Sequence, residues 1–486
     1  MSISPSMKQC LVTFGAAINQ AIICMIPSYT SRLLPQLRRD DSIIAVDDNM
    51  ASWIASVHGI TLFVGNISVP LIMGQYGRKP ANLVSNIISL IGWLCIMFSS
   101  NVTLILIGNL LQGLSMGMVI SLPSIVIAEC TNPKNRAIFT SVTLIQLSIT
   151  SLLVHTIGSY CSWKLTAFVC AIIIFTGLLI TIITPESPSW LAEKGKYEES
   201  KQAFLWLRGE DGVDEFEHLM NAATRRNNDN KNASKHFLTN AKRKILKNMQ
   251  ALKYRECFMP VLIMIHLYTF GNWCGASTII IYLQDIFSIL TSPDTDINLQ
   301  IVFTDVLCLC YNIIAIFILK NCKRRFILCS FLSFNILILL CTALYTYCKA
   351  HDILPFDYPF IGILLVHLFL FSYLSGILPL TVAIDGEVFC LEYRSFSAGI
   401  TNLYYSIAIS LVIKTFSYLK NCIGFHGTYL LYTGICSYTL LFLLKFMPET
   451  KDKTLLDIEN EFKKEVVTPN DSNLIKPLTV HDHIAY

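Results

Sequence analysis

Twelve apolar segments, each long enough to cross a membrane, constrain this chain more than any other feature. A membrane-spanning helix needs about 20 apolar residues, so twelve spans need about 240. The apolar fraction of 53% in 486 residues supplies that number. The runs are continuous rather than alternating, and only helices and closed barrels satisfy their backbone hydrogen bonds in lipid. We therefore predict an all-α membrane protein with twelve transmembrane helices. The segments lie near residues 10–31, 52–73, 82–99, 103–128, 138–159, 163–184, 258–281, 299–319, 326–347, 358–384, 397–418 and 428–447.

The composition argues against several other classes of protein. Charged residues make up 14% of the chain, against about 25% in soluble domains, and the net charge of +4 is too small to indicate a nucleic-acid binder. The sequence contains no Walker-type phosphate loop and no HExxH zinc motif, so we expect no cofactor, no metal and no ATP-driven step. The 17 cysteines mostly lie in apolar runs and are interpreted as small core residues. An enzyme is not expected.

A long polar stretch divides the apolar segments six and six. We expect an N-terminal six-helix bundle over residues 1–184, a linker with short helices over 185–257, a C-terminal bundle over 258–447 and a tail over 448–486. Lys and Arg are concentrated in the linker, in the tail and in the loops on the same side of the membrane. The positive-inside rule therefore predicts that the linker and both termini are cytoplasmic.

Two similar motifs follow the sixth and the twelfth segments. Residues 185–191 read PESPSWL, residues 448–451 read PETK, and residues 77–79, between the second and third segments, read GRK. In these motifs the chain resembles the sugar porter family of the major facilitator superfamily, with its PESPxWL and PETK signatures and its GR[RK] loop. The resemblance covers nearly the whole chain. It implies two six-helix pseudo-repeat bundles that alternately open to the two sides of the membrane.

Four further segments narrow the resemblance. Residues 29–31 (YTS), 34–37 (LPQL), 52–54 (SWI) and 414–416 (KTF) stand near the ends of helices 1, 2 and 11. In these segments the chain is similar to the insect facilitated trehalose transporter-like proteins.

A charge pattern repeats in the two halves. Glu129 is followed after seven residues by Arg136, and Glu387 is followed after seven residues by Arg394. Together with Arg78, these residues stand at predicted cytoplasmic helix ends. We interpret them as a latch that ties neighbouring helices together when the cytoplasmic side is closed and separates when that side opens.

The resemblance also implies a sugar-binding site made of neutral polar side chains. Gln146 in helix 5 and Asn402 in helix 11 match substrate-contacting amides of the family. The family's QQxSGxN stretch in helix 7 aligns so that Asn272 keeps an amide and Ser277 replaces the last Asn. Amides and hydroxyls suit the hydroxyl groups of a sugar because they both donate and accept hydrogen bonds. For each of these residues the alternative is a hydrogen bond between helices.

The same alignment shows losses. Gly271 replaces the first Gln of the helix 7 stretch, and Leu380 replaces the Trp of a GPxPW stretch in helix 10. We expect a wider or less polar site, with altered substrate choice or lower affinity for simple hexoses. Tyr268 and Trp273 are candidates for an aromatic face, although a Trp in a membrane helix more often packs against lipid or a neighbouring helix.

Several ionisable residues lie within the predicted spans. The carboxylate of Asp305 in helix 8 would cost free energy within the membrane, so we expect it to have a functional role. It could bind a sugar hydroxyl, accept a proton, or lie in water near the outer end of its helix. Four histidines, His58, His155, His266 and His367, are interpreted as packing residues rather than a proton relay.

The sequence thus predicts a facilitative transporter of hexose or trehalose in the plasma membrane, with a sugar and the lipid bilayer as its partners and the oligomeric state left open. Proton-coupled relatives of this kind usually carry an Asp in helix 1, whereas this chain has no acidic residue between Cys10 and Tyr29. Two alternatives remain, a proton-coupled sugar symporter and a non-transporting sugar sensor of the same fold.

Overall fold

A computed structural model of the chain describes residues 4–39, 44–132, 136–209, 252–290, 296–353, 359–389 and 393–451, together with isolated positions elsewhere. Across these residues all regular secondary structure is helical.

The first half of the chain forms six helical passes. The first pass consists of α1 and α2, which meet at Ala21, and the fourth consists of α5 followed by α6. The helices are α1 (Pro5–Gln20), α2 (Ile22–Leu37), α3 (Asp48–Gln75), α4 (Arg78–Met97), α5 (Val102–Val119), α6 (Leu122–Cys130), α7 (Arg136–Tyr160) and α8 (Trp163–Ile183).

The second half of the chain follows two short helices, α9 (Pro188–Glu193) and α10 (Tyr197–Arg208). Two π-helical turns, η3 and η4, lie within its passes. The elements are α13 (Arg255–Trp273), α14 (Ala276–Ile281), α15 (Leu283–Leu290), α16 (Ile297–Asn321), α17 (Arg324–Ile327), η3 (Leu328–Leu332), α18 (Ser333–Ala350), α19 (Pro359–Ser372), η4 (Tyr373–Ile377), α20 (Leu378–Glu387) and α21 (Arg394–Phe446).

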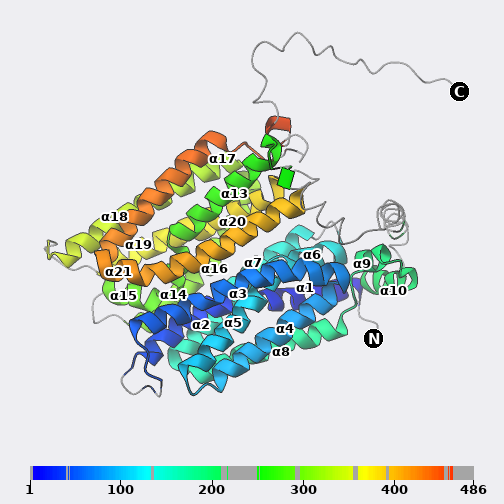
Figure 1. Ribbon diagram of the computed structural model, residues 1–486, viewed down its shortest axis with the longest axis horizontal. Coiled ribbons are helices and arrows are strands. Elements are labelled where there is room, and N and C mark those ends of the chain that lie inside the picture. The colour runs from blue at the N-terminus through cyan, green and yellow to red at the C-terminus, as the bar shows by residue number, and fades with distance from the viewer. Residues whose placement is uncertain are drawn as a thin grey trace, which may run out of the picture.

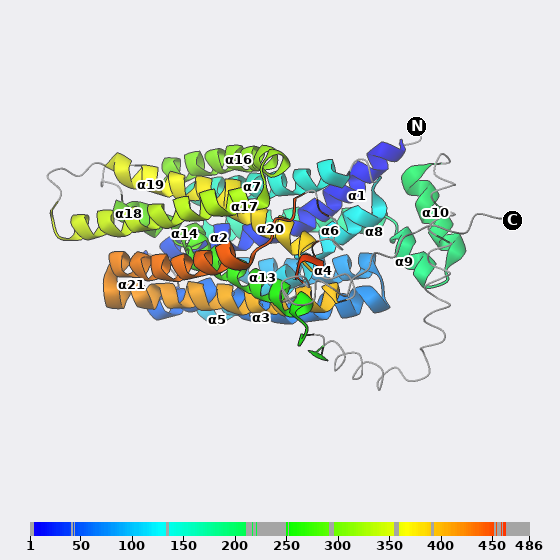
Figure 2. The ribbon, with the colours of Figure 1, turned by 90° about the horizontal axis from the view of Figure 1, so that it is seen from above.

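These elements make twelve passes. Among the described residues, 10 helical stretches are long and apolar enough to cross a membrane. One of them, Phe396–Phe446, changes direction at Gly424, whose φ of +72° is left-handed, and its two arms lie side by side (Figure 2). Helix α7 adds another pass of 25 residues. The all-α fold with twelve membrane helices is confirmed.

The two halves lie next to each other, the first in blue to teal and the second in green to orange (Figure 1). Helices α9 and α10 lie beyond one end of the first bundle (Figure 2). We call this end, where α4 and α17 begin, the linker face. The end where α2 finishes and α3 starts is called the opposite face.

Close contacts at glycines pack α3 against α5 in the first half. Gly65 of α3 packs against α5, where an added Cβ would collide with the carbonyl oxygen of Leu114. Gly117 of α5 packs against α3 in the same way, facing the carbonyl oxygen of Leu62. Small residues allow backbones to approach in membrane bundles, where van der Waals packing is a main source of helix association.

Candidate functional site

A network of carboxylates and arginine stabilises the linker face of the first half. The carboxylate of Glu186 accepts hydrogen bonds from the backbone N–H of Arg78 at 3.0 Å and of Lys79 at 3.1 Å. The guanidinium of Arg78 donates to Glu129 at 2.6 Å, and the hydroxyl of Ser187 donates to the other oxygen of Glu129 at 2.5 Å. Burial raises the pKa of Glu186 above its ordinary value, although the backbone donors act against the rise.

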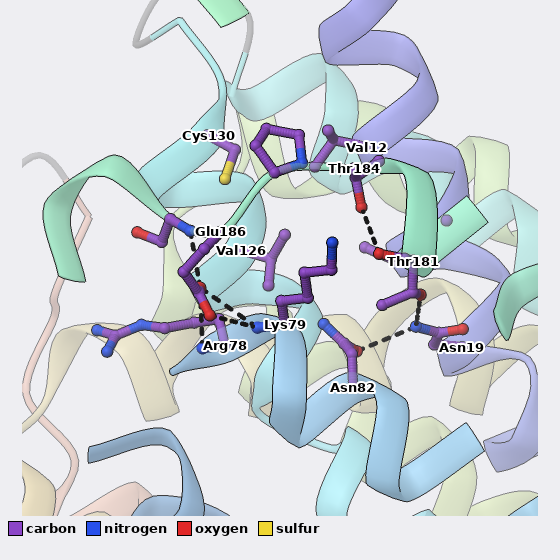
Figure 3. Close-up of a pocket in the computed structure, with 14 residues that line it drawn as sticks. Val12, Asn19, Arg78, Lys79, Asn82, Val126, Cys130, Thr181, Thr184 and Glu186 are labelled. Atoms are coloured by element: carbon purple, nitrogen blue, oxygen red, sulfur yellow. Dashed lines mark hydrogen bonds between the residues drawn. The ribbon is translucent and has the colours of Figure 1, made fainter. Parts of the chain in front are cut away.

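Glycine at position 77 makes this network possible. Gly77 precedes α4 with a φ of +113°, and an added Cβ would collide with the carboxylate of Glu186. Figure 3 shows the small pocket beside the network, where Asn19 donates to Asn82 at 3.0 Å and to Thr181 at 3.3 Å. This pocket lies inside the first half and is lined by residues other than the predicted sugar ligands.

The second half repeats the same network. The carboxylate of Glu449 accepts from the backbone N–H of Arg324 at 2.9 Å and of Arg325 at 3.1 Å. The guanidinium of Arg324 donates to Glu387 at 2.9 Å, and Thr450 donates to Glu387 at 2.6 Å. Burial raises the pKa of Glu449, but the backbone N–H donors outweigh it and the net pKa lies below the ordinary value. Both signature motifs therefore hold the beginning of a helix through one glutamate.

Three of the predicted latch residues, Arg78, Glu129 and Glu387, lie in these two networks. Arg78 contacts its carboxylate partner as part of the first network, whereas the side chains of Arg136 and Arg394 lie outside the described residues. Sequence reasoning did not include Arg324 in the latch. The signal for it was its position, because Arg324 begins its helix in the second half as Arg78 does in the first. Among the described residues, Arg78 binds Glu129 of its own half and Arg324 binds Glu387 of its own half.

Different contacts join the two halves, and they begin at the opposite face. Arg38 forms an ion pair with Asp285 at 2.9 Å. The ammonium of Lys414 lies 4.1 Å from the centre of the Trp53 ring, and the hydroxyl of Ser52 donates to the backbone carbonyl of Lys414 at 3.3 Å. Two of the segments that narrowed the family resemblance, 52–54 and 414–416, thus meet across the bundles.

A buried arginine adds to this closure. Arg32 is only 3% exposed, and its Nη1 donates to Gln284 and to Asn298 of the second half, both at 3.1 Å. Its carbon stem packs over Gly158 of α7, where an added Cβ would lie 2.8 Å from it. At the opposite face the two halves are therefore joined by an ion pair from Arg38 and by hydrogen bonds from Arg32 to neutral amides.

Two further hydrogen bonds join the two halves near the middle of the bundles. Asn312 donates to Ser148 at 2.6 Å, and Asn66 donates to Ser406 at 2.8 Å. Ser148 lies twelve residues from the start of α7, which is about 18 Å at 1.5 Å per residue. The described residues thus represent a state closed at the opposite face.

The predicted sugar ligands lie in the middle of the bundles. Gln146 donates to Thr150 on its own helix at 2.7 Å, and its amide oxygen is buried without a hydrogen-bond partner among the described residues. Asn272 donates to the backbone carbonyl of Tyr268 at 2.8 Å, and the hydroxyl of Tyr268 lies 3.4 Å from the amide oxygen of Asn402. Asn402 therefore lies beside the hydroxyl of Tyr268, whereas the amide of Asn272 bonds the backbone of its own helix.

The aromatic candidates separate in the structure. Tyr268 also donates to Asp385 at 3.3 Å, and its ring lies 5.2 Å from the ring of Tyr405, so it belongs to a polar and aromatic cluster. Trp273 instead packs edge-on against Tyr432 within the second half. Sequence reasoning did not place Asp385 with the sugar ligands.

The two remaining candidates differ in burial. Ser277 is half-buried on α14. Asp305 is 5% exposed on α16 and contacts two residues of α7, His155 at 2.7 Å and Ser151 at 3.2 Å. The interpretation of His155 as a packing residue did not foresee this pair.

Comparison with known proteins identifies the class to which this fold and site belong. The family model described as "Sugar (and other) transporter" matches residues 11–462. The chain belongs to this sugar transporter family.

Individual relatives agree with this assignment. The chain is 25% identical over 475 residues to the facilitated trehalose transporter Tret1 of Drosophila erecta, covering 97% of this chain and 54% of that protein. Tret1 of Aedes aegypti is 25% identical over 477 residues, with 97% and 57% covered. The chain thus spans about half the length of the curated relatives it matches.

Solved structures show the same fold. The proton:xylose symporter XylE, a major facilitator superfamily protein bound to 6-bromo-6-deoxy-D-glucose, superposes with a TM-score of 0.72 at 16% identity, covering 94% of this chain and 100% of that one. The inward-open conformation of XylE from E. coli gives a TM-score of 0.70 at 16% identity, with 93% and 99% covered. At this level of identity, the likeness establishes the major facilitator fold.

Proposed function

We propose that the protein is a facilitative sugar transporter that moves a hexose or trehalose through the plasma membrane by alternating access. The linker and both termini face the cytoplasm in this proposal, because Lys and Arg are concentrated on that side of the sequence. Membership of the sugar transporter family supports the class of substrate, and the similarity to Tret1 proteins supports trehalose as one candidate.

The observation that supports the proposal is the joining of the two halves at the opposite face. Ion pairs and hydrogen bonds join them from Arg38 to Ser148 and Asn66, and two ion pairs described at the linker face, Arg78–Glu129 and Arg324–Glu387, each lie within one half. A transporter that alternates between two openings needs such a state, with one face closed and the other free to separate. Opening the opposite face would break the Arg38–Asp285 pair and close the linker face.

Recognition of the sugar falls to the neutral groups in the middle of the bundles. The unpartnered amide oxygen of Gln146 can accept a hydrogen bond from a sugar hydroxyl, and the hydroxyl of Tyr268 can turn from Asn402 to the ligand. Asn272, Ser277 and Asp305 are further candidates from the same part of the fold. The charges of the two linker-face networks, with Arg136 and Arg394, serve as the latch, whose contacts between the halves form when the linker face closes.

Uptake into liposomes tests the proposal. The purified chain should carry labelled sugar saturably, without ATP or sodium, and we expect Gln146→Ala and Asn402→Ala each to raise KM by about tenfold, the worth of one lost hydrogen bond to a ligand. Thr176→Ala, at an exposed position of α8, is the matched control and should leave uptake unchanged. Uptake that is indifferent to both amides would refute the assigned site.

Two alternatives give other results in the same assay. A proton-coupled symporter would accumulate sugar uphill under an imposed pH gradient, and the buried Asp305–His155 pair is the observation that favours it. A non-transporting sensor would bind sugar without flux.

A further inference from the structure

Two hydrogen bonds between the halves have the same chemistry with the halves exchanged. Nδ2 of Asn66 on α3 donates to the hydroxyl of Ser406 on α21 at 2.8 Å, and Nδ2 of Asn312 on α16 donates to the hydroxyl of Ser148 on α7 at 2.6 Å. In the first bond the asparagine belongs to the first half, and in the second bond it belongs to the second half. Both serines are buried. The two bonds therefore form a related pair inside the interface.

The two asparagines stand at the same place in the repeat of the fold. Asn66 lies nine residues before Gln75, where α3 ends, and Asn312 lies nine residues before Asn321, where α16 ends. Both helices end at the linker face, just before α4 and α17 begin. Nine helical residues rise about 14 Å, so the two amides lie at about the same depth below that face.

The two serines occupy equivalent positions as well. Ser148 lies twelve residues after Arg136, where α7 begins, and Ser406 lies twelve residues after Arg394, where α21 begins. Helix α7 packs against α16 along one long edge of the molecule, and α3 packs against α21 along the other (Figure 2). The line that joins the two bonds therefore runs across the interface between the halves.

Both serines lie close in sequence to candidate sugar ligands. The hydroxyl of Ser406 donates to the backbone carbonyl of Asn402, one turn earlier on α21, at 2.8 Å. A hydroxyl has one proton, so the oxygen of Ser406 is left to accept from Asn66. Ser148 lies two residues after Gln146 on α7. Each bond thus fastens a helix that carries a candidate ligand to the other half.

We propose that these two Asn–Ser bonds persist in both states of the transporter and form the axis about which the halves rock. This inference rests on the alternating access of the proposed function. A rotation about the line through both bonds leaves them intact. A rotation about another line breaks at least one of them and leaves buried polar groups without partners, which is unfavourable within a membrane. The four side chains are therefore positioning residues that keep Gln146 and Asn402 in place as the openings alternate.

The same rotation breaks the contacts of the opposite face. Ser52 lies fourteen residues before Asn66 on α3, about 21 Å along the helix, and donates to the backbone carbonyl of Lys414. At that distance from the axis a rotation of about 15° moves the hydroxyl by about 5 Å, which is beyond the reach of a hydrogen bond. Contacts far from the axis are therefore made and broken, whereas the two bonds on the axis remain.

Distance measurements at two depths test the axis. Spin labels placed by noncanonical amino acids at Leu165 and Leu299, which are exposed near the starts of α8 and α16, report the separation of the halves at the opposite face. Two further pairs report the ends of the axis. They use exposed residues next to the bonded side chains, Ile67 with Ile407 and Ile149 with Ile313.

Arg38→Met, which removes an ion pair of the opposite face, supplies the open population. In this variant the Leu165–Leu299 distance should gain a population that is longer by about 5 Å or more, as the 15° rotation requires. Both axis distances should change by less than about 2 Å, because points on an axis do not move apart.

A double variant tests the bonds themselves. Asn66→Leu with Asn312→Leu removes both donors and should widen the two axis distance distributions. Asn109→Leu is the matched control, because Asn109 donates to the backbone carbonyl of Ile54 within the first half and its loss should leave these distributions unchanged. If the double variant does not fold, Ser406→Ala takes its place and should widen the Ile67–Ile407 distribution, since it removes one acceptor.

Each outcome decides the matter. An axis distance that lengthens together with the Leu165–Leu299 distance would overturn the axis, as would axis distributions that stay narrow when the bonds are removed. A single distance at the opposite face in every sample would also overturn it, because an axis requires two states. Sugar influx measured on the same samples separates the two proposals. Absent influx with halves that move about a fixed axis would refute the transport function and leave the axis standing.

Discussion

Removal of the arginine that joins the halves at the opposite face should open that face. Arg38 is 27% exposed and donates to Asp285 of the second half at 2.9 Å and to Asp48 of the first half at 3.3 Å. Only the bond to Asp285 changes when the halves separate. Asp48 lies in the same half as Arg38 and is 72% exposed, so it contributes little to closure.

The magnitude follows from this one bond. A half-buried, charge-assisted hydrogen bond contributes about 1–2 kcal/mol, so Arg38→Met, which keeps the apolar stem, should lower the ratio of closed to open molecules by about tenfold. Asp285→Asn should have an effect of similar direction, and the double variant should add little, because both changes remove the same bond.

The assay is the distance between spin labels at Leu165 and Leu299 at fixed pH. Lys196→Met is the matched control, since Lys196, just before α10, pairs with Glu199 in the first turn of that helix and both are more than half exposed. A closed population that is unchanged in Arg38→Met, or that falls equally in Lys196→Met, would refute the view that this ion pair stabilises closure.

Three further predictions concern stability. Because burial raises the pKa of Glu186 in the folded state, stability should decline as pH rises above about 4.5, and melting of Glu186→Gln in detergent should lack that decline. The pKa of Glu449 is lowered, so its stabilisation should be present above about pH 4.5 and be lost as pH falls, and Glu449→Gln should lack that loss. If the two variants shift the pH–melting profile in the same direction, the assigned environments are wrong. Gly117→Ala should destabilise the first half by about 1–3 kcal/mol through collision with α3, whereas Gly434→Ala, with nothing within 4 Å, should melt like the unaltered chain.

The fold was accessible from the sequence because a membrane permits few solutions. Continuous apolar runs such as 163–184 can only be buried as helices in lipid, and the described helix Trp163–Ile183 matches that run closely. The repeated motifs at 185–191 and 448–451 placed two equivalent glutamates, which the structure shows at the start of α4 and α17.

The contacts between distant side chains were less accessible. His155 and Asp305 are 150 residues apart, and no local pattern indicates that α7 and α16 pack with these two residues facing each other. The same holds for Lys414 and Trp53, which were singled out separately and meet only in three dimensions. Pairing across the halves depends on how two rigid bundles lie against each other, and that arrangement has no signature within a short window of sequence.

The central claim is that one sugar site is exposed alternately to the two sides of the membrane. Counterflow measures this most directly. Liposomes containing the protein and preloaded with unlabelled sugar should transiently accumulate labelled sugar above its external concentration. Labelled sugar that has entered must compete with the excess unlabelled sugar for the inward-facing site, so it leaves more slowly than it enters. Labelled sugar that equilibrates without an overshoot, at a rate that does not saturate, would contradict alternating access and indicate a pore.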